Sequence, residues 1–362
     1  MRVVQLLPEL NEGGVERGTV ELSRELVKMG HESIVISSGG KLVSKIGKEG
    51  GRHELFDVSS KNPFSVPSRV TGLRRLLDEI DPDIVHARSR VPAWLAYMAN
   101  RKSRRPFVTT VHGFNSINRY SRIMTAGERV ICVSEAVKSY IVDAYDTPLE
   151  KIRVIPRGID PDIFDPAKLD REFMDDFVKR HDLKNRYVAT VAGRITQLKG
   201  IEVFLDALAQ ARKSVPELVG LIVGGVRSDK ERYFETLLER ATDLDLEGCV
   251  LFVGSIDKMA EIYALSDVVV NSSLKAESFG RSAAEALAMG TPVIAAAHGG
   301  ILDIVIPEKT GWLFAPGDSD ALAKALVAST NGSFDDLGTY AMKNFSLRKM
   351  VEKTIEVYKE LL

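Results

Sequence analysis

The sequence predicts an α/β protein built from two doubly wound, Rossmann-like domains. Three observations support this fold class. The chain has 362 residues, more than one ordinary hydrophobic core organises. Short runs rich in Val and Ile alternate with longer amphipathic segments along the whole chain. Continuous apolar strands separated by helices are typical of parallel sheets that are covered on both faces.

The first half of the chain contains six strand-like runs. The first of them is followed by an amphipathic pattern over residues 15–30, and Gly30 ends this predicted helix in the manner of a C-terminal cap. The runs are RVVQLL (2–7), SIVIS (33–37), DIVHA (83–87), FVTTVHG (107–113), RVICVS (129–134) and KIRVIP (151–156).

The second half repeats the alternation after an interruption. Between Ile155 and Asp170 three prolines and four aspartates break the pattern, so we place the boundary there and predict domains over residues 1–165 and 166–345. A final amphipathic helix over 346–362 closes the second domain or packs on the first. The later strand-like runs are YVATVAG (187–193), LVGLIVGG (218–225), CVLFVG (249–254), DVVVNSS (267–273) and TPVIAAA (291–297).

Composition restricts the class of protein. The opening residues lack the apolar stretch of a signal peptide, and no apolar run approaches the ~18 residues of a membrane-spanning helix. Cys132 and Cys249 each lie in an apolar run, which favours buried thiols in a reducing compartment. We therefore expect a cytoplasmic protein, at most peripheral on the inner face of the membrane, with neither a disulfide nor a zinc site.

Charge is unevenly distributed although the formal net charge is −1. Residues 61–122 contain 12 Lys and Arg against 4 Asp and Glu, a local excess of 8. This excess predicts either solvated helix faces or a first domain that receives an anionic acceptor or contacts an anionic membrane. Nucleic acid is not expected, because no aromatic interleaving or known reading module accompanies the charge.

The residues that directly follow strands are the informative ones, because doubly wound sheets bind ligands outside the carboxyl ends of their strands. With two such domains we expect a site in a cleft between them. Gly13 and Gly14 follow the first strand and open the first helix, where backbone N–H groups can approach a ligand. Their spacing is not the G-x-G-x-x-G fingerprint, which argues against an NAD enzyme. A tight turn alone would also explain them.

Arg194 and Lys199 are the stronger signal. Both lie in one loop that follows the strand ending at Gly193. Two cations at this place suit a diphosphate, one as a bidentate fork and the other as a point charge. The alternative is a pair of solvated loop cations.

Glu277 and Glu285 flank a Phe-Gly-Arg turn, and we predict a helix from about residue 280 or 282 to 289. Carboxylates accept hydrogen bonds from sugar or ribose hydroxyls, while the N–H groups of Phe279 and Gly280 can bind phosphate or hydroxyl oxygens. A structural explanation competes, because SAAE matches a capping box in which Ser282 caps the helix and Glu285 reaches back.

Further candidates follow other strands. His112 ends a strand of the first domain and precedes a glycine, and His86 has a similar place but a weaker case. Gly299 and Gly300 form a glycine-rich turn after the last apolar run. Arg157 lies where the first domain gives way to the linker.

Together these motifs resemble the retaining glycosyltransferases of family 4, which have the GT-B fold and an E-x7-E pattern. The resemblance covers nearly the whole chain. The sequence is similar to bacterial members of the family that build lipopolysaccharide and other surface glycans. Its motifs are GGVER, TVHG, VSEAVK, IPRGID, GRITQLKG, ESFGRSAAEALAMGTPVIA, GWLFAPGD and the closing helix.

The resemblance implies a role for each matched residue. Lys199 and Arg194 would bind the donor's diphosphate, Glu277 the hydroxyls of the transferred sugar and Glu285 the ribose. His112 would contact the donor sugar near the reacting carbon, and the last helix would cross back onto the first domain. The remaining donor contacts would be Gly13, Gly14, Val253, Gly254, Ile256, Ser278, Phe279 and Gly280, and the candidate acceptor or phosphate contacts would be Arg157, Gly299 and Gly300.

The expected reaction is transfer of a sugar from a nucleotide diphosphosugar, a UDP-sugar by preference, to a hydroxyl of a glycan or lipid-linked acceptor. Fixed cations and a helix N-terminus can neutralise the leaving diphosphate, so no metal or other cofactor is expected. Two alternatives stay open: a nucleotide-sugar epimerase, and a non-catalytic nucleotide-sugar-binding subunit. Arg157 departs from the family, where many relatives have Asn, as does the GGILDIV segment, where many have Pro before the acid.

Overall fold

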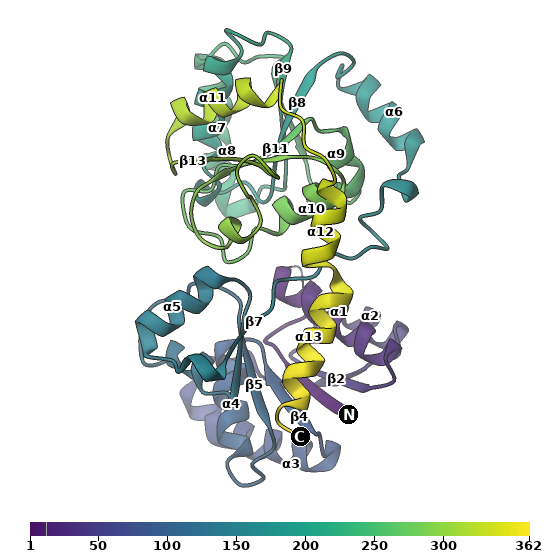
Figure 1. Cartoon of the computed structure of the whole chain (residues 1–362). Coiled ribbons are helices and arrows are strands. Elements are labelled where there is room, and N and C mark those ends of the chain that lie inside the picture. The colour runs from purple at the N-terminus through teal and green to yellow at the C-terminus, as the bar shows by residue number, and fades with distance from the viewer. Residues whose placement is uncertain (12) are drawn as a thin grey trace. The chain divides into compact units, whose positions relative to one another are not determined.

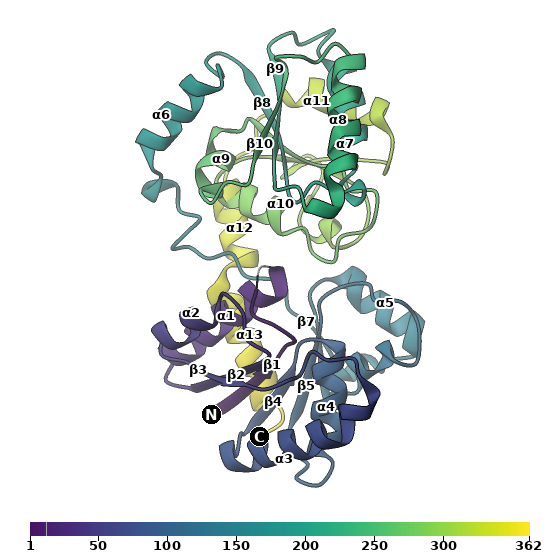
Figure 2. The same ribbon diagram turned by 180° about the vertical axis from the view of Figure 1, so that it is seen from behind.

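The computed structural model describes residues 1–11 and 13–362, which form two compact units (Figures 1 and 2). Unit 1 contains residues 1–158 and 347–362, and unit 2 contains residues 159–346. Each unit is an α/β layer structure with a parallel sheet between helices. The prediction of two parallel-sheet, Rossmann-like domains is confirmed.

Unit 1 has a seven-stranded parallel sheet with the order β3-β2-β1-β4-β5-β6-β7. The order reverses between β1 and β4, which are directly paired, with Val3 opposite Ile84. Loops that follow these two strands leave the sheet in opposite directions, which opens a place for ligands at their carboxyl ends. The strands are β1 (Arg2–Leu6), β2 (Glu32–Ser37), β3 (Arg52–Leu55), β4 (Ile84–Ala87), β5 (Phe107–Val111), β6 (Arg129–Cys132) and β7 (Ile152–Val154).

The helices of unit 1 cover both faces of this sheet (Figure 1). The first helix ends as expected: the chain turns at Gly30, whose N–H donates a hydrogen bond to the carbonyl of Val27. The helices are α1 (Gly14–Lys28), α2 (Val43–Lys48), α3 (Val66–Ile80), α4 (Arg90–Asn100), α5 (Glu135–Tyr145) and α13 (Leu347–Lys359), with short 3₁₀ turns at Pro63–Ser65, Ser121–Thr125 and Leu149–Lys151.

Helix α13 belongs to unit 1 although it comes last in the sequence. Leu347, Val351 and Ile355 pack on a cluster of buried strand residues that includes Val108 and Ile131. Tyr358 is fully buried and its hydroxyl lies 2.7 Å from Nδ1 of His86. The resulting hydrophobic contact makes this helix an integral layer of the unit rather than a surface addition.

Unit 2 has a six-stranded parallel sheet with the order β10-β9-β8-β11-β12-β13, and its order reverses between β8 and β11. Alternate residues of β9 face opposite layers: Val219 and Leu221 pack toward α6 and α9, whereas Leu218 and Ile222 pack toward α7, α8 and α11. Both faces are thus dry, which explains the uninterrupted apolar run. The strands are β8 (Tyr187–Ala192), β9 (Leu218–Val223), β10 (Val250–Gly254), β11 (Val268–Asn271), β12 (Val293–Ala296) and β13 (Gly311–Phe314).

The helices of unit 2 complete its two layers. They are α6 (Arg171–Arg180), α7 (Ile201–Ala211), α8 (Glu231–Asp243), α9 (Met259–Leu265), α10 (Arg281–Ala288), α11 (Ser319–Ser329) and α12 (Leu337–Phe345), with 3₁₀ turns at Pro166–Lys168, Gln197–Lys199, Ser228–Lys230 and Gly300–Asp303.

The unit boundary lies between Gly158 and Ile159, seven residues before the predicted one. The reason is that Ile159 bridges to Ser346 and donates its N–H to the carbonyl of Phe345, within unit 2. Phe164 also lies against Tyr263 of the same unit. The proline-rich segment therefore already belongs to the second fold. The helix predicted over 346–362 corresponds to α13 of unit 1, and α12 of unit 2 precedes it.

Candidate functional site

The loops that follow β8 and β11 meet in unit 2, because these strands are the neighbours between which the sheet order reverses. Lys199 comes from the first loop and Glu277 from the second. Their Nζ and Oε1 atoms lie 2.5 Å apart, and the two side chains are 27% and 21% exposed. A half-buried ion pair at this edge of the sheet is accessible to a ligand that can exchange for either partner.

Glu277 is held by further hydrogen bonds. Ser273 donates its hydroxyl to the same Oε1 at 2.7 Å, and Asn271 contributes another side-chain bond. Burial alone would raise the pKa of this carboxyl, but Lys199 and these two donors outweigh it and lower the pKa below its ordinary value. Glu277 is therefore a carboxylate at neutral pH, a form that only accepts hydrogen bonds.

The backbone of Glu277 is fixed by the next glycine-rich turn. The N–H of Gly300 donates to the carbonyl of Glu277 at 2.7 Å. A Cβ at Gly300 would lie 2.3 Å from the carbonyl oxygen of Ser278, so this position excludes any side chain. Gly299 bridges to Glu277, and His298 contacts the carbonyl of Ser273 at 2.8 Å through Nε2. The turn after β12 thus supports the acidic loop.

Lys199 is positioned by backbone contacts between the two loops. Gly200 begins α7 with φ +60, and a Cβ there would lie 2.2 Å from the carbonyl oxygen of Ser272. The Ser272 hydroxyl donates to the carbonyl of Lys199, and the N–H of Leu274 donates to that of Leu198, both at 2.9 Å. The lysine side chain then runs back over Gly193, at the end of β8.

Arg194 lies on the same loop but is exposed and has no hydrogen bond or ion pair with the described residues 1–11 and 13–362. The structure thus brings together Lys199, Glu277 and the two glycines after β12, and leaves Arg194 at the edge. A cation without an internal partner keeps its full capacity for an incoming anion.

Glu285 is more buried than expected. It is 8% exposed, and its carboxylate accepts bonds from Arg281 at 2.8 Å and from the hydroxyl of Tyr263 at 3.2 Å. The capping-box explanation is wrong, because α10 begins after Gly280, in the left-handed region, and no side chain caps it. The ribose role of Glu285 stays a prediction.

The turn at the start of α10 has one buried anchor. Phe279 is 2% exposed and its ring lies 5.8 Å from that of Phe345. Ser278 is half-buried beside it. The burial of Phe279 fixes the backbone on which Glu277 and the N-terminus of α10 are presented.

The predicted base contacts lie at the end of β10. Val253 and Ile256 are half-buried and Gly254 is exposed. The carbonyl of Gly254 accepts from the N–H of Gly224 at 2.8 Å, and a Cβ on Gly224 would lie 1.9 Å from the carbonyl oxygen of Gly193. The glycine pair after β9 was not assigned from the sequence, although it also follows a strand. Asn271 and Ser273 were missed in the same way, in the NSS triplet after β11.

Unit 1 carries a second cluster, after β1, β4 and β5. His112 has Nδ1 3.5 Å from Nη2 of Arg157, and Arg157 donates from Nη1 to the carbonyl of Gly14 at 2.5 Å. The sequence-predicted Gly14, His112 and Arg157 are thus brought together, with Gly13 as the N-cap of α1. His86 is excluded from this site, because both of its ring nitrogens bond buried hydroxyls, those of Tyr358 and Thr110.

Arg88 belongs to the same cluster and was not singled out from the sequence. It is 7% exposed, and it donates to the amide oxygen of Gln5 at 3.2 Å. Burial lowers the pKa of Arg88 to about 10, which leaves it charged at neutral pH. Burial, together with Arg88 and Arg157, lowers the pKa of His112 well below its ordinary value. A neutral histidine between two cations is the result.

The Nε2 atom of His112 is buried and has no hydrogen-bond partner among the described residues. An unpaired buried imidazole nitrogen costs free energy unless a ligand satisfies it. This atom indicates a ligand site in unit 1.

Comparison with known proteins agrees with this fold. The model described as Glycosyltransferase Family 4 matches residues 12–163, and the model described as Glycosyl transferases group 1 matches residues 173–331. A crystal structure of a glycosyltransferase from Rickettsia africae ESF-5 superposes with a TM-score of 0.91 at 33% identity, over 99% of this chain and 98% of that one. The chain belongs to the glycosyltransferases with the GT-B fold.

Two further proteins are similar to this chain at lower identity. The GDP-mannose-dependent alpha-(1-6)-phosphatidylinositol monomannoside mannosyltransferase of Mycolicibacterium smegmatis is 27% identical, over 87% of this chain and 85% of that protein. Anabaena HepE, solved in complex with UDP and glucose, has a TM-score of 0.85 at 22% identity and covers all of both chains, a likeness of fold.

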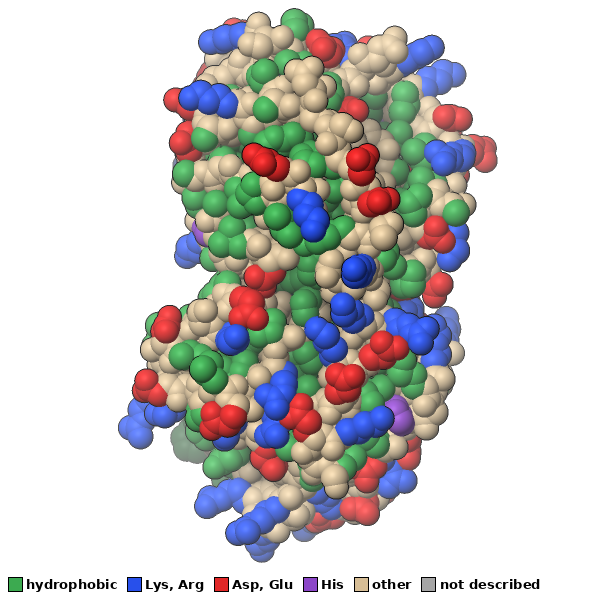
Figure 3. Space-filling model, viewed as in Figure 1, with side chains coloured by type: hydrophobic (Ala, Val, Ile, Leu, Met, Phe, Trp, Pro, Cys, Tyr) green, Lys and Arg blue, Asp and Glu red, His purple; other side chains and the backbone are tan. Residues whose placement is uncertain are grey.

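The basic segment from residue 61 to residue 122 separates into distinct parts in the structure. Arg105 pairs with Asp78 and Asp81, and Arg88 is buried, whereas Lys61, Arg69 and Arg90 line a pocket. Acidic and basic side chains are interspersed on the face that Figure 3 shows. The charge excess of this segment is therefore not explained by solvated helix faces alone.

Two further expectations concern thiols and membranes. Cys132 and Cys249 are free, but Cys249 is half-buried rather than buried, because it precedes β10 at the sheet edge. Burial raises the pKa of the Cys132 thiol to about 12. In the part of the chain that the structure describes, no helix combines the length and apolar character required to cross a bilayer.

Proposed function

We propose that the chain is a retaining glycosyltransferase that moves a sugar from a nucleotide diphosphosugar to a hydroxyl of a glycan or lipid-linked acceptor. The observation that carries this proposal is the Lys199–Glu277 pair at the strand-order reversal of unit 2. It joins a phosphate-binding cation to a carboxylate that accepts sugar hydroxyls, at the place where doubly wound sheets bind ligands.

The donor is held in unit 2 in this proposal. Lys199 and the exposed Arg194 bind the diphosphate, and Glu277 accepts hydrogen bonds from the transferred sugar. The ion pair holds the two side chains close to one another. HepE, which shares the fold, binds UDP and glucose, and the mycobacterial relative uses GDP-mannose. We take UDP-sugars as the first donors to test and GDP-sugars as the second.

The chemical step balances without an added base. The bond between the anomeric carbon and the leaving phosphate oxygen breaks, and the acceptor oxygen forms a bond to the same face of that carbon. Because the new bond forms on the face that the phosphate leaves, the configuration is retained. The acceptor's proton passes to the leaving phosphate. Lys199 and Arg194 stabilise the charge that grows on the diphosphate, in the way that a metal ion does in other enzymes. We therefore propose metal-independent transfer.

His112 acts on the transferred sugar as a neutral hydrogen-bonding group. The low pKa of its ring keeps the imidazole uncharged, so Nε2 is free to bond a sugar hydroxyl. Arg88 and Arg157 remain charged beside it, so the neutral imidazole of His112 is surrounded by positive charge.

A panel of UDP-, GDP- and ADP-sugars tests the proposal, first by thermal shift and then by release of nucleoside diphosphate with and without acceptor. A donor far above its Kd should stabilise the protein by several kcal/mol. Slow hydrolysis of that donor without acceptor, and retained configuration in the product, would support transfer. Conversion to an isomeric nucleotide sugar would show an epimerase, and tight binding with neither reaction would show a binding subunit.

A further inference from the structure

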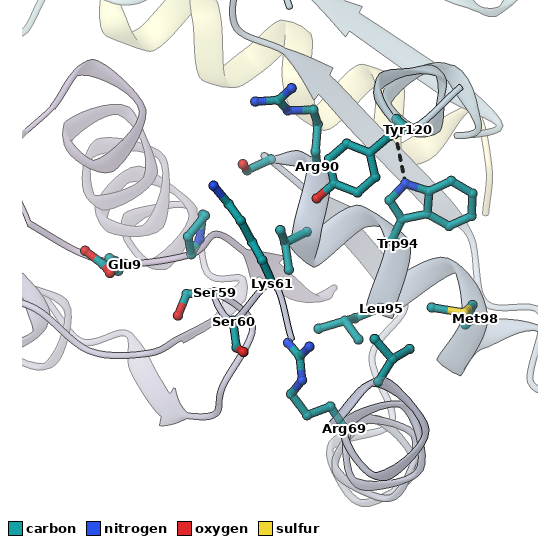
Figure 4. Close-up of a pocket in the computed structure, with 14 residues that line it drawn as sticks. Glu9, Ser59, Ser60, Lys61, Arg69, Arg90, Trp94, Leu95, Met98 and Tyr120 are labelled. Atoms are coloured by element: carbon teal, nitrogen blue, oxygen red, sulfur yellow. Dashed lines mark hydrogen bonds between the residues drawn. The ribbon is translucent and has the colours of Figure 1, made fainter. Parts of the chain in front are cut away.

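Unit 1 contains a pocket of about 640 Å³ that the donor chemistry does not use (Figure 4). Its walls come from the segments that follow β1, β3 and β4 and from α3 and α4, so it lies beside the strand-order reversal of this unit. The volume is typical of a site for one small organic ligand. The lining residues are Pro8, Glu9, Ser59, Ser60, Lys61, Val66, Arg69, Ser89, Arg90, Val91, Trp94, Leu95, Met98 and Tyr120.

One side of the pocket is built to receive an anion. Arg69 is 7% exposed, and Figure 4 shows its guanidinium directed into the pocket, toward the side on which Ser60 and Lys61 lie. Its Nε donates to the hydroxyl of Ser65 at 3.0 Å and its Nη2 to the carbonyl of Asn62 at 3.3 Å. Its Nη1 is buried without a hydrogen-bond partner among the described residues. An orphaned donor on a buried cation calls for an acceptor from a ligand.

Other groups on this side support the same chemistry. Lys61 is exposed at the pocket and makes no ion pair within residues 1–11 and 13–362. The 11-residue helix α4 begins here without a side-chain cap, which leaves the first N–H groups, those of Arg90 and Val91, for a ligand. Two carboxylates lie near: Asp57 is 3.9 Å from Arg69, and Glu9 at the rim accepts from Asn11.

The opposite side of the pocket is apolar. Trp94, Leu95 and Met98 of α4 lie together on this side (Figure 4), and Val66 and Val91 are further apolar lining residues. The indole of Trp94 donates to the carbonyl of Tyr120 at 2.9 Å and the two rings are stacked. Arg90 lies over the Tyr120 ring, with its Cζ 5.7 Å from the centroid. These bonds lock an aromatic wall in place, which lowers the entropic cost of binding an apolar group.

We infer that this pocket binds an amphipathic phosphate ester as the acceptor, with the phosphate at Arg69 and Lys61 and an apolar group against Trp94 and Met98. Three cations against the two carboxylates of Glu9 and Asp57 favour a phosphate dianion, and the apolar wall excludes water from the rest of the ligand. The inference rests on the proposed function, because it names the class of acceptor that a transferase of this chain would glycosylate.

Calorimetric titration of the full chain with alkyl phosphates tests this without any donor. We expect butyl, hexyl and octyl phosphate to bind with affinity that rises by up to ~4-fold per methylene until the pocket is full. Inorganic phosphate and octanol each lack one half of the ligand and should bind at least ~10-fold more weakly than octyl phosphate. Equal affinity for octyl phosphate and inorganic phosphate would overturn the inference.

Two substitutions and one matched control locate the binding. Arg69→Met should abolish the preference for octyl phosphate over octanol, and Lys61→Met should weaken octyl phosphate binding by about 3- to 10-fold. Arg75→Met, an exposed arginine on the same helix that does not line the pocket, should change nothing. If Arg69→Met unfolds, the exposed Lys61 still tests the site. Unchanged binding in Lys61→Met would contradict the assignment.

A second arm separates the two sources of this chemistry. Sedimentation with phosphatidic acid vesicles tests whether the ligand is a membrane lipid, and titration with soluble esters tests whether it is a free phosphate ester. Lys61→Met must weaken the binding of whichever ligand binds. Binding in neither experiment would contradict the inference. The experiments distinguish a wrong acceptor class from a wrong proposed function. Donor stabilisation and hydrolysis that persist without alkyl phosphate binding would refute only the acceptor class, whereas alkyl phosphate binding without any donor reaction would refute the transferase.

Discussion

Oε1 of Glu277 receives both the ammonium of Lys199 and the hydroxyl of Ser273, at 2.5 and 2.7 Å. One carboxylate oxygen thus connects the loop after β8 to the loop after β11. Asn271 is a further side-chain partner of this carboxylate. In the proposed function, Glu277 is therefore the residue at which the phosphate-binding cation and the sugar-binding group meet.

The negative charge of Glu277 should matter more for donor turnover than the size of its side chain. Glu277→Gln keeps the size but loses the charge-assisted bonds, so we expect kcat/KM to fall by about 10- to 100-fold, with the melting temperature changed little. Steady-state kinetics with the preferred donor measures this. Glu239→Gln, an exposed acid of the same unit, is the matched control. Wild-type kinetics in Glu277→Gln would exclude the carboxylate from donor binding.

Gly300 should tolerate no side chain. Gly300→Ala places a Cβ 2.3 Å from the carbonyl of Ser278, so the loop that holds Glu277 must shift. We expect a loss of about 1–3 kcal/mol in unfolding free energy and a larger proportional loss of turnover. Denaturant unfolding and kinetics report the two effects. Gly47→Ala on α2, where nothing lies within 4 Å, should be neutral or slightly stabilising.

His112 should act as a neutral group across the physiological range. Its pKa is lowered by burial and by Arg88 and Arg157, so the rate should show no His112 ionisation between about pH 6 and 8. Removing one of these charges with Arg157→Met should raise this pKa and move an acidic limb upward in the pH–rate profile. A limb near pH 6.5 in the wild type that disappears in His112→Asn would contradict this account.

Stability should fall as the pH drops below about 6.5, the ordinary pKa of an unfolded histidine. Burial lowers the pKa of His86 well below that value, so the unfolded state binds a proton that the folded state does not. Its contribution is fully present above the unfolded pKa and is lost as the pH falls toward the folded pKa. The limiting slope is ~1.4 kcal/mol per pH unit for one such group.

His86→Gln isolates this contribution. The variant loses stability overall, because bonds to Tyr358 and Thr110 are altered, but its unfolding free energy should depend less steeply on pH between 6.5 and 5. Denaturant titrations at several pH values give both slopes. Identical slopes would show that His86 is not the buried group responsible.

The sequence predicted the doubly wound fold because buried parallel strands are written as uninterrupted Val and Ile runs. It missed β3 (RHEL) and β13 (GWLF), which lie at the edges of their sheets, are short and carry polar or glycine residues. An edge strand is buried on fewer sides, so its pattern resembles a loop. Register and edge position come from tertiary packing, which no local pattern contains.

The candidate site was predicted in part. Lys199, Glu277 and the two glycines after β12 were found because each follows a strand, and the structure brings them together. Arg69 could not be found in this way, since its burial depends on how α3 packs beside the loop after β3. Glu285 illustrates the converse: SAAE fits a cap locally, yet Gly280 starts the helix and Arg281 takes the carboxylate.

The most direct test of the central claim is the turnover of Lys199→Ala against that of Lys213→Ala, an exposed lysine of the same unit, with the donor that stabilises the wild type most. Release of nucleoside diphosphate should be at least ~10²-fold slower in Lys199→Ala, by analogy with loss of one group that stabilises transition-state charge, and unchanged in Lys213→Ala. Equal turnover in the two variants, with both folded, would contradict the assignment of Lys199 to the leaving diphosphate.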